Sequence, residues 1–559
     1  MDYKNLIADC IIIEGIDNSD IKASIGEPND TCKGDYSMPC FKFSKVLRKS
    51  PVVIAQELAS SIILPEGLSE VQAINGYLNF FIDKTAFLLN TIDKVIAECE
   101  NFGSSKLGEG KTICIDYSSI NIAKPFHIGH LSTTVIGSSL YRIYLKLGYQ
   151  VIGINHLGDW GTQFGKLIVA FKKWGDRRDV EKNGIRSLLK LYVKFHKLAE
   201  EDESLNEEGR AWFKKIEDGD AYALELFELF KKVTLTEVSK VYDRLGVKFD
   251  SYAGESFYND KMQPILDMLE EKKLIVTSEG AKIVELENMP PCLLVKADGA
   301  TLYATRDLAA AFYRKTEYDF YKCLYVVAYQ QNLHFNQFFE VVRLMGCPWY
   351  KDLEHVAFGM VSLVDGTLST RKGKILFLEE VLDKAVEKAY NIIEEKNPDL
   401  EDKAKVAEQI GVGAVIFTSL YNSRIKDITF SYDKVLSFEG ETAPYIQYTY
   451  ARCSSVLEKV EASKDFNIEG INNQESHEIA RLIAKFPEII ESAAERNEPS
   501  YIARFAVNLA KLYNKFYFEH RVSDSDSGIR GARLKITLAV RTTLKNALDL
   551  LGISAPEKM

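Results

Sequence analysis

The chain has 559 residues and a formal net charge of −10, with 46% hydrophobic and 27% charged residues. This length exceeds what one hydrophobic core supports, so we expect roughly three or four domains. There is no apolar run long enough to span a membrane and no secretory signal, and the nine scattered cysteines contain no C-x-x-C pair. We therefore expect a cytoplasmic protein without a membrane segment, a disulfide framework or a protein-bound structural metal.

The acidic net charge argues against a nucleic-acid partner, but the charge is unevenly distributed along the chain. Residues 501–559 contain ten Lys and Arg against five Asp and Glu. An acidic protein with such a segment is able to present one basic face. The charge balance therefore leaves RNA binding open without establishing it.

The first part of the chain mixes helix-like and strand-like segments over residues 1–110, including a helical pattern at 50–63. It ends in the glycine-rich polar stretch GSSKLGEG at 103–110, which is typical of a linker. We expect an N-terminal α+β domain over residues 1–110.

The next part alternates strands and helices. Residues 112–117 (TICIDY) form an apolar strand pattern, and residues 149–155 (YQVIGIN) form another. Between them, Pro125 is placed for the first turn of a helix that runs to about Leu147. A strand, a helix and a second strand at this spacing predict a parallel βαβ unit.

A second α/β half follows a charged, mostly helical insertion near 166–285. The half consists of a strand at 323–328 (CLYVVA), a helix near 332–345 and a strand at 355–361. Two βαβ halves separated by a helical insertion predict a Rossmann-like nucleotide-binding domain over 111–380.

The remainder of the chain, residues 381–559, is almost wholly helical in its periodicity. Residues 502–518, for example, place apolar side chains at three- and four-residue intervals. This pattern predicts a helix bundle as the C-terminal domain.

The segment from Ser118 to His130 (SSINIAKPFHIGH) leaves the first strand of the sheet and enters a helix. Open parallel sheets bind ligands at this edge, where the free backbone N–H groups of a helix start favour phosphate. His127 and His130 are suited to donate to phosphate oxygens, and Gly129 leaves space for an adenine ring. Two incidental histidines, or two ligands of a zinc site, are the alternatives. A zinc site lacks its third ligand here.

The complete string resembles the HIGH motif of class I aminoacyl-tRNA synthetases, in the extended form of the arginyl enzymes. Residues 155–165 (NHLGDWGTQFG) resemble a further arginyl motif, and the resemblance covers nearly the whole chain. It implies an N-terminal domain that contacts tRNA, a class I catalytic domain and an all-helical anticodon-binding domain. It also implies a cytoplasmic monomer that joins L-arginine to AMP, using ATP with Mg²⁺, and then to the 3′ end of tRNA(Arg).

The second class I motif, KMSKS, falls at residues 362–374 (SLVDGTLSTRKGK), where both of its lysines are missing. A surface hairpin loop is the alternative for this segment. Some arginyl enzymes use a lysine ahead of HIGH instead, which matches Lys124. Which of Lys124, Arg371, Lys372 and Lys374 replaces the missing lysines stays open. The resemblance implies that His127, His130 and Lys124 are catalytic. It implies that ATP is bound by His127, Gly129, His130, His334, Ser369, Arg371 and Lys372.

Recognition of arginine requires acidic groups that receive a guanidinium, with aromatic or apolar walls. Tyr303 and Asp307, in the string LYATRD, share one face if a helix begins there. The string resembles the arginyl Y-x-T-R-D motif, although Asp307 taken alone also suits a helix cap or a solvated carboxylate. The resemblance implies that arginine is bound by Asp116, Asn121, Tyr303, Asp307 and Gln331.

Two alternative functions remain at this point. One is another class I specificity, such as cysteine or glutamate. The lack of zinc-binding cysteines argues against the first, and the acidic pocket residues argue against the second. The other is a synthetase-like RNA-binding or regulatory protein without aminoacylation. The intact HIGH residues and Asp307 argue against it, while the degenerate second motif keeps it open.

Overall fold

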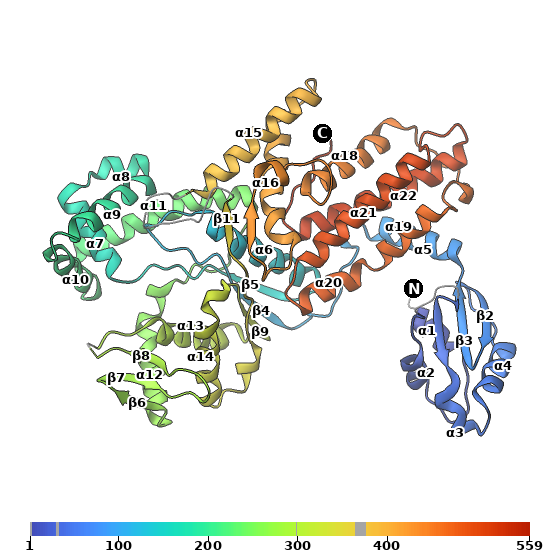
Figure 1. The fold of residues 1–559 in the computed structure, drawn as a ribbon, viewed down its shortest axis with the longest axis horizontal. Coiled ribbons are helices and arrows are strands. Elements are labelled where there is room, and N and C mark those ends of the chain that lie inside the picture. The colour runs from blue at the N-terminus through green and yellow to red at the C-terminus, as the bar shows by residue number, and fades with distance from the viewer. Residues whose placement is uncertain (1–2, 29–32, 298, 364–375) are drawn as a thin grey trace. The chain divides into compact units, whose positions relative to one another are not determined.

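The computed structural model describes residues 3–28, 33–297, 299–363 and 376–559 (Figure 1). The chain divides into two compact units. The first consists of Met1–Phe102, Val456–Lys485 and Lys511–Thr543, and the second of Gly103–Ser455, Phe486–Ala510 and Leu544–Met559.

The first unit begins with a small antiparallel sheet and its helices. These elements are α1 Tyr3–Asp9, α2 Asn18–Ser24, β1 Tyr36–Pro39, α3 Ser44–Leu47, α4 Pro51–Ser61, β2 Leu68–Ile74, β3 Tyr77–Ile82 and α5 Lys84–Glu98. The strand order is β1-β3-β2, and the Leu78 and Phe80 side chains of the central strand are buried in the core. Ser50 caps α4 with its hydroxyl, and Pro51 occupies the first turn, which confirms the helix expected at 50–63.

A four-stranded parallel sheet forms the core of the second unit (Figure 1). Its strands and connecting helices are β4 Thr112–Asp116, α6 Leu131–Lys146, β5 Gln150–Ile154, β9 Lys322–Tyr325, α14 Asn332–Leu344 and β10 Leu353–His355. The order is β10-β9-β4-β5, so β4-α6-β5 extends the sheet one way and β9-α14-β10 the other. The carboxyl ends of β4 and β9 flank this reversal, where open α/β sheets bind ligands. The expected Rossmann-like fold is confirmed.

A largely helical insertion connects the two halves of this sheet. Its helices are α7 Thr162–Trp174, α8 Arg177–Asn183, α9 Ile185–Ala199, α10 Ser204–Glu217, α11 Ala221–Leu245 and α12 Met262–Glu271. An antiparallel sheet of β6 Ile275–Ser278, β7 Ala281–Val284 and β8 Cys292–Val295 follows, and then α13 Tyr303–Tyr318. Helices α7, α9 and α10 pack against one another. The insertion expected as helical near 166–285 therefore also contains strands.

The loop between β4 and α6 corrects one expectation. The sequence predicts a helix from Pro125, but the α-helix begins at Leu131, after the 3-10 turn η4 Ile128–His130. Ala123 has a left-handed φ of 60°, and His127 has extended backbone angles and forms a strand-like bridge to a distant segment. Because extended residues do not continue a helix, Pro125 lies ahead of the helix rather than in its first turn.

A second correction concerns residues 355–361, which the sequence predicts as one strand. The structure has β10 and a separate β11 Val361–Leu363, which pairs in parallel with β12 Ile428–Phe430. A Cβ at Gly359 would lie 2.4 Å from the carbonyl carbon of Lys426. The close crossing of these two segments therefore requires glycine, and it interrupts the strand.

The rest of the chain is helical, as its periodicity predicts, apart from β12. The helices are α15 Leu378–Lys396, α16 Lys403–Tyr421, α17 Tyr432–Val435, α18 Ala443–Lys459, α19 Gln474–Ala484, α20 Phe486–Glu495, α21 Ser500–Glu519 and α22 Ser527–Leu550. Among the described residues, no helix combines the length and the apolar character needed to cross a membrane.

Candidate active site

Two histidines lie together just before α6, beyond the carboxyl end of β4. Their ring centroids are 4.1 Å apart. His127 Nδ1 accepts the backbone N–H of Gly129 at 3.0 Å, and His130 Nδ1 accepts the backbone N–H of His127 at 3.2 Å. A Cβ at Gly129 would lie 2.7 Å from the His127 ring, so only glycine fits this turn. The structure thus brings these three predicted ATP-binding residues together in one reciprocal cap.

Both histidines are neutral at physiological pH. Desolvation lowers the pKa of His127. Desolvation and the charges of His127 and Lys124 together lower the pKa of His130 to about 3. A neutral imidazole carries one proton, and both Nδ1 atoms act as acceptors. Each proton therefore resides on Nε2, which makes the two side chains hydrogen-bond donors without a positive charge.

Asp116, the last residue of β4, has its carboxylate engaged by the protein's own side chains. Its Oδ2 accepts from Arg314 Nη2 at 2.7 Å, and its Oδ1 accepts from the Ser119 hydroxyl at 2.6 Å. The Arg314 and Asp116 side chains are only 1% and 8% exposed. Desolvation alone would lower the pKa of Arg314, but the charge of Asp116, together with Tyr258, Tyr325 and Cys323, raises this pKa well above its usual value. The negative charge of Asp116 is therefore compensated by Arg314 within the protein.

Asp307 lies one turn into α13, four residues after Tyr303, and next to the start of α14. Its Oδ2 is 2.7 Å from His334 Nε2, and the His334 ring centroid is 4.7 Å from that of Tyr303. Burial would raise the pKa of Asp307, but the hydrogen bond and charge of His334, together with the charges of His156 and Arg314, lower this pKa. Tyr303 and Asp307 share the start of one helix, as their spacing predicts, and His334 joins them from α14.

Asn121 and Gln331 follow β4 and β9, respectively, in the chain. Asn121 forms a bridge with Gly158, whose Cβ, if present, would lie 2.4 Å from Asn121 Oδ1. The segment 155–165 therefore packs closely against the loop that follows β4. Gln331 is exposed at the end of the 3-10 turn η6 Tyr329–Gln331, directly before α14.

Glu255 is a site residue that the sequence motifs did not indicate. It begins the 3-10 segment η5 Glu255–Lys261, and its Oε2 lies 4.0 Å from Arg306 Nη1. Burial raises the pKa of Glu255 to about 7, Arg306 opposes this rise, and the negative charge of Asp307 adds to it. Desolvation lowers the pKa of Lys124, which the charge of Glu255 partly offsets. Glu255 thus interacts electrostatically with both Asp307 and Lys124.

Asp159, in the segment that resembles an arginyl motif, is fully buried and fully bonded. It accepts from Lys231 Nζ at 2.7 Å and from the backbone N–H and hydroxyl of Ser256, both at 2.8 Å. A Cβ at Gly254 would lie 2.7 Å from Asp159 Oδ1. Gly254 is the one feature of the local sequence that could have drawn attention to Glu255. The reason for this glycine, its close approach to Asp159, is visible only in the folded structure.

The charge balance of the site leaves two carboxylates for a ligand. Asp116 and Asp159 are each paired with a cation at 2.7 Å. Asp307 is bonded to a histidine, Glu255 lies 4.0 Å from an arginine, and their side chains are 25% and 27% exposed. Two accessible carboxylates favour a cationic ligand with several donors, such as a guanidinium.

Comparisons with known proteins show which family carries this site. The family model described as tRNA synthetases class I (R), catalytic domain, matches residues 91–432. The chain belongs to the class I arginyl-tRNA synthetases. Two further models, the arginyl tRNA synthetase N terminal domain and the DALR anticodon binding domain, match residues 1–82 and 446–559 of this arginyl-tRNA synthetase.

Individual relatives agree with the family match. Proteins named arginine–tRNA ligase from Clostridioides difficile (strain 630) and Alkaliphilus metalliredigens (strain QYMF) are 52% and 50% identical, each over 100% of both chains. The solved arginyl-tRNA synthetase structure from Thermus thermophilus has a TM-score of 0.78 at 25% identity and covers 96% of each chain. The family predicted from the HIGH-like and Y-x-T-R-D-like strings is confirmed.

The segment predicted to be the second class I motif lies outside the described residues from position 364 onward. Ser369, Arg371, Lys372 and Lys374 fall in 364–375, so their roles stay predictions. In the described part of the chain, no group of three or more His, Cys, Asp and Glu side chains is placed to hold a metal ion.

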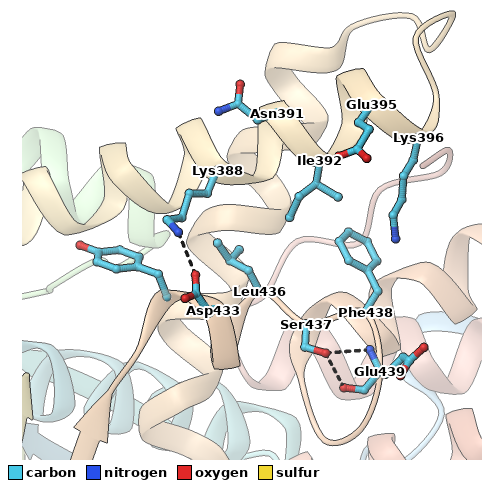
Figure 2. Close-up of a pocket in the computed structure, with 11 residues that line it drawn as sticks. Lys388, Asn391, Ile392, Glu395, Lys396, Asp433, Leu436, Ser437, Phe438 and Glu439 are labelled. Atoms are coloured by element: carbon cyan, nitrogen blue, oxygen red, sulfur yellow. Dashed lines mark hydrogen bonds and ion pairs between the residues drawn. The ribbon is translucent and has the colours of Figure 1, made fainter. Parts of the chain in front are cut away.

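A cavity of about 560 Å³ lies elsewhere on the synthetase, between α15 and the segment around α17 (Figure 2). Lys388 pairs with Asp433 across it at 2.8 Å, and Lys396 Nζ lies 5.3 Å from the Phe438 ring centroid. The predicted catalytic, ATP-binding and arginine-binding residues are not in its lining. The candidate active site is therefore defined by the charged groups at the sheet edge, and not by cavity size.

Proposed function

We propose that this arginyl-tRNA synthetase activates L-arginine with ATP and transfers it to tRNA(Arg) at the carboxyl ends of β4 and β9. The observation that carries the proposal is the pair of accessible carboxylates, Asp307 and Glu255, in one site with the neutral donors His127 and His130. The carboxylates suit a guanidinium, and the donors suit phosphate oxygens. Mg²⁺ enters with ATP as part of the substrate.

In the first step, an oxygen of the arginine carboxylate attacks the α-phosphorus of ATP. A new P–O bond forms, and the bond to the β-phosphate oxygen breaks to release pyrophosphate. Charge develops on the phosphoryl oxygens, where the Nε2–H groups of His127 and His130 and the ammonium of Lys124 stabilise it. The other proposed ATP contacts are Gly129, His334, Ser369, Arg371 and Lys372.

Arginine is held by its guanidinium and by its backbone groups. Asp307 and Glu255 accept the guanidinium donors, and the Tyr303 ring forms a wall of the pocket. Asn121, Gln331 and Asp116 make the remaining polar contacts. His334 and Arg314 hold the carboxylates of Asp307 and Asp116 in place.

In the second step, the terminal ribose hydroxyl of tRNA attacks the carbonyl carbon of the adenylate, and AMP leaves. We assign contacts with tRNA to an N-terminal domain over residues 1–110 and a helical domain over 381–559. The catalytic domain extends over 111–380, with the insertion near 166–285. The enzyme works as a cytoplasmic monomer.

ATP–pyrophosphate exchange with a panel of amino acids, with and without tRNA(Arg), tests this function. We expect exchange with arginine, and attachment of arginine to tRNA(Arg). Exchange with another amino acid would contradict the pocket assignment. RNA binding without exchange or attachment would favour a non-catalytic RNA-binding protein.

Lys124→Ala is expected to slow adenylate formation by about tenfold or more while leaving arginine binding nearly unchanged. Its ammonium interacts electrostatically with Glu255 and with His130, which we assign to the ATP phosphates. Single-turnover adenylate formation at saturating arginine, ATP and tRNA measures the effect. A near-normal rate would transfer the role to Lys372 or Lys374, and Lys124→Arg tests whether a positive charge alone is sufficient.

The arginine KM is expected to rise as the pH falls below about 7, because burial raises the pKa of Glu255 to about 7. Above this pKa the carboxyl is ionised and attracts the guanidinium, and below it the carboxyl is neutral. Well below the pKa, the KM should increase by up to about tenfold per pH unit. The measurement is the arginine KM across this range in the wild type and in Glu255→Gln. A pH dependence that persists in Glu255→Gln would exclude this carboxyl as its source.

A further inference from the structure

Arg424 connects two segments that are far apart in the sequence. Its Nε donates to the carbonyl of Asn497 at 3.0 Å, and its Nη1 donates to the carbonyl of Ala357. Its backbone N–H donates to Glu498 Oε2 at 3.2 Å, and its carbonyl accepts the N–H of Gly359 at 2.7 Å. A single residue thus joins the turn between α20 and α21 to the segment that follows β10.

The turn that holds Arg424 is itself fixed to the catalytic sheet. Asn497 has a left-handed φ of 49°. Its side-chain amide donates to Glu354 Oε1 at 2.6 Å and accepts from the Tyr144 hydroxyl at 2.8 Å. Because Glu354 belongs to β10 and Tyr144 to α6, this turn is anchored to both halves of the sheet.

The segment held by Arg424 supports the proposed arginine pocket. Ala357 and Gly359, both bonded to Arg424, flank Phe358. Phe358 bridges to Ala328, and its carbonyl accepts the N–H of Tyr329 at 3.0 Å. Tyr329 opens η6, which ends at Gln331, and α14 begins directly after it. Hydrogen bonds of the Arg424 side chain and backbone with residues 357–359, and the bond from Tyr329 to Phe358, therefore connect Arg424 to the turn that contains Gln331.

We propose that Arg424 is a positioning residue for arginine recognition, acting through residues 357–359 and η6 on Gln331. The inference rests on the proposed arginine-binding role of Gln331. A guanidinium is required because its planar fork bonds carbonyls of two segments at once, which the single ammonium of lysine does not reproduce. Asn497 and Glu498 lie in the region matched by the anticodon-binding domain model, so part of that region supports the arginine pocket.

The first test compares Arg424→Lys with the wild type in ATP–pyrophosphate exchange. We expect the arginine KM to rise by about 3- to 30-fold. Asn497→Gly keeps the left-handed backbone accessible but removes the amide bonds, and we expect it to raise the KM in the same direction. The matched control is Lys426→Ala, which removes an exposed cation two residues away and should leave the KM unchanged. Thermal unfolding monitored by circular dichroism verifies that each variant is folded.

A double-mutant cycle with Gln331→Ala separates positioning from a general structural role. If Arg424 acts through Gln331, Arg424→Lys should change the arginine KM by less than about twofold in the Gln331→Ala background. Full additivity of the two effects would overturn the proposal. So would an unchanged KM in folded Arg424→Lys while Gln331→Ala raises it. An unchanged KM in Gln331→Ala would instead overturn the pocket assignment in the proposed function.

Discussion

His127→Asn is expected to lower the rate constant of arginyl-adenylate formation by about 10²- to 10³-fold. The asparagine side-chain oxygen replaces Nδ1 as the acceptor for the Gly129 N–H, so the turn before α6 is retained. The Nε2–H, which we assign to the ATP phosphates, is lost. Because this donor acts on charge that develops in the transition state, the rate should fall more than the KM for ATP rises. Single-turnover measurements at saturating substrates give the rate directly.

His127→Gln is the matched control for this prediction. Its longer side chain places an amide nitrogen near the position of Nε2, so it keeps a donor for the phosphate and loses the acceptor for Gly129. We expect His127→Gln to be faster than His127→Asn. If the two variants were equally slow, or if the asparagine variant were the faster, the Nε2–H would not be the important group. A faster asparagine variant would indicate that the cap of η4, which asparagine retains, accounts for the defect.

Asp307→Asn is expected to lower kcat/KM for arginine roughly 10- to 150-fold. This corresponds to a loss of about 1.5–3 kcal/mol of transition-state stabilisation. The amide oxygen still accepts from His334, but the residue loses the negative charge that we assign to binding the substrate guanidinium. The effect should therefore appear mainly in the arginine KM, while the ATP KM changes little.

Steady-state kinetics with each substrate varied in turn measure this separation. An unchanged arginine KM would remove Asp307 from the pocket. An equal rise in both KM values would indicate a general distortion of the site instead. Glu255→Gln provides the comparison at the second carboxylate, and the two substitutions should act on the same KM.

Local patterns predicted most of the elements that frame the site. Periodicity correctly located strands β4 and β5, helix α14 and the C-terminal helices. It did so because burial of one face of an element requires apolar residues at regular intervals in the sequence. The two errors have a common cause. His127 is held in an extended conformation by a bridge to another segment, and Gly359 permits a close backbone crossing. Such long-range backbone contacts override local preferences and leave no local pattern.

The sequence by itself determined the family and most of the candidate residues, because contiguous strings carry them. The string around His127 and His130 and the string LYATRD each place several functional groups within one loop or one helical turn. Their relative spacing is set by local backbone geometry. The identity and order of these residues are therefore readable without the rest of the fold, whereas the backbone conformation at His127 is not.

Only the tertiary structure decided which charges are available to substrates. Asp116 is compensated by Arg314, 198 residues away, and Asp159 by Lys231, 72 residues away, while Glu255 has no such close ion pair among the described side chains. The same packing makes His130 neutral and raises the pKa of Glu255 to about 7. The physical reason is that desolvation and ion pairing depend on which groups the fold brings together, and a linear sequence does not specify those neighbours.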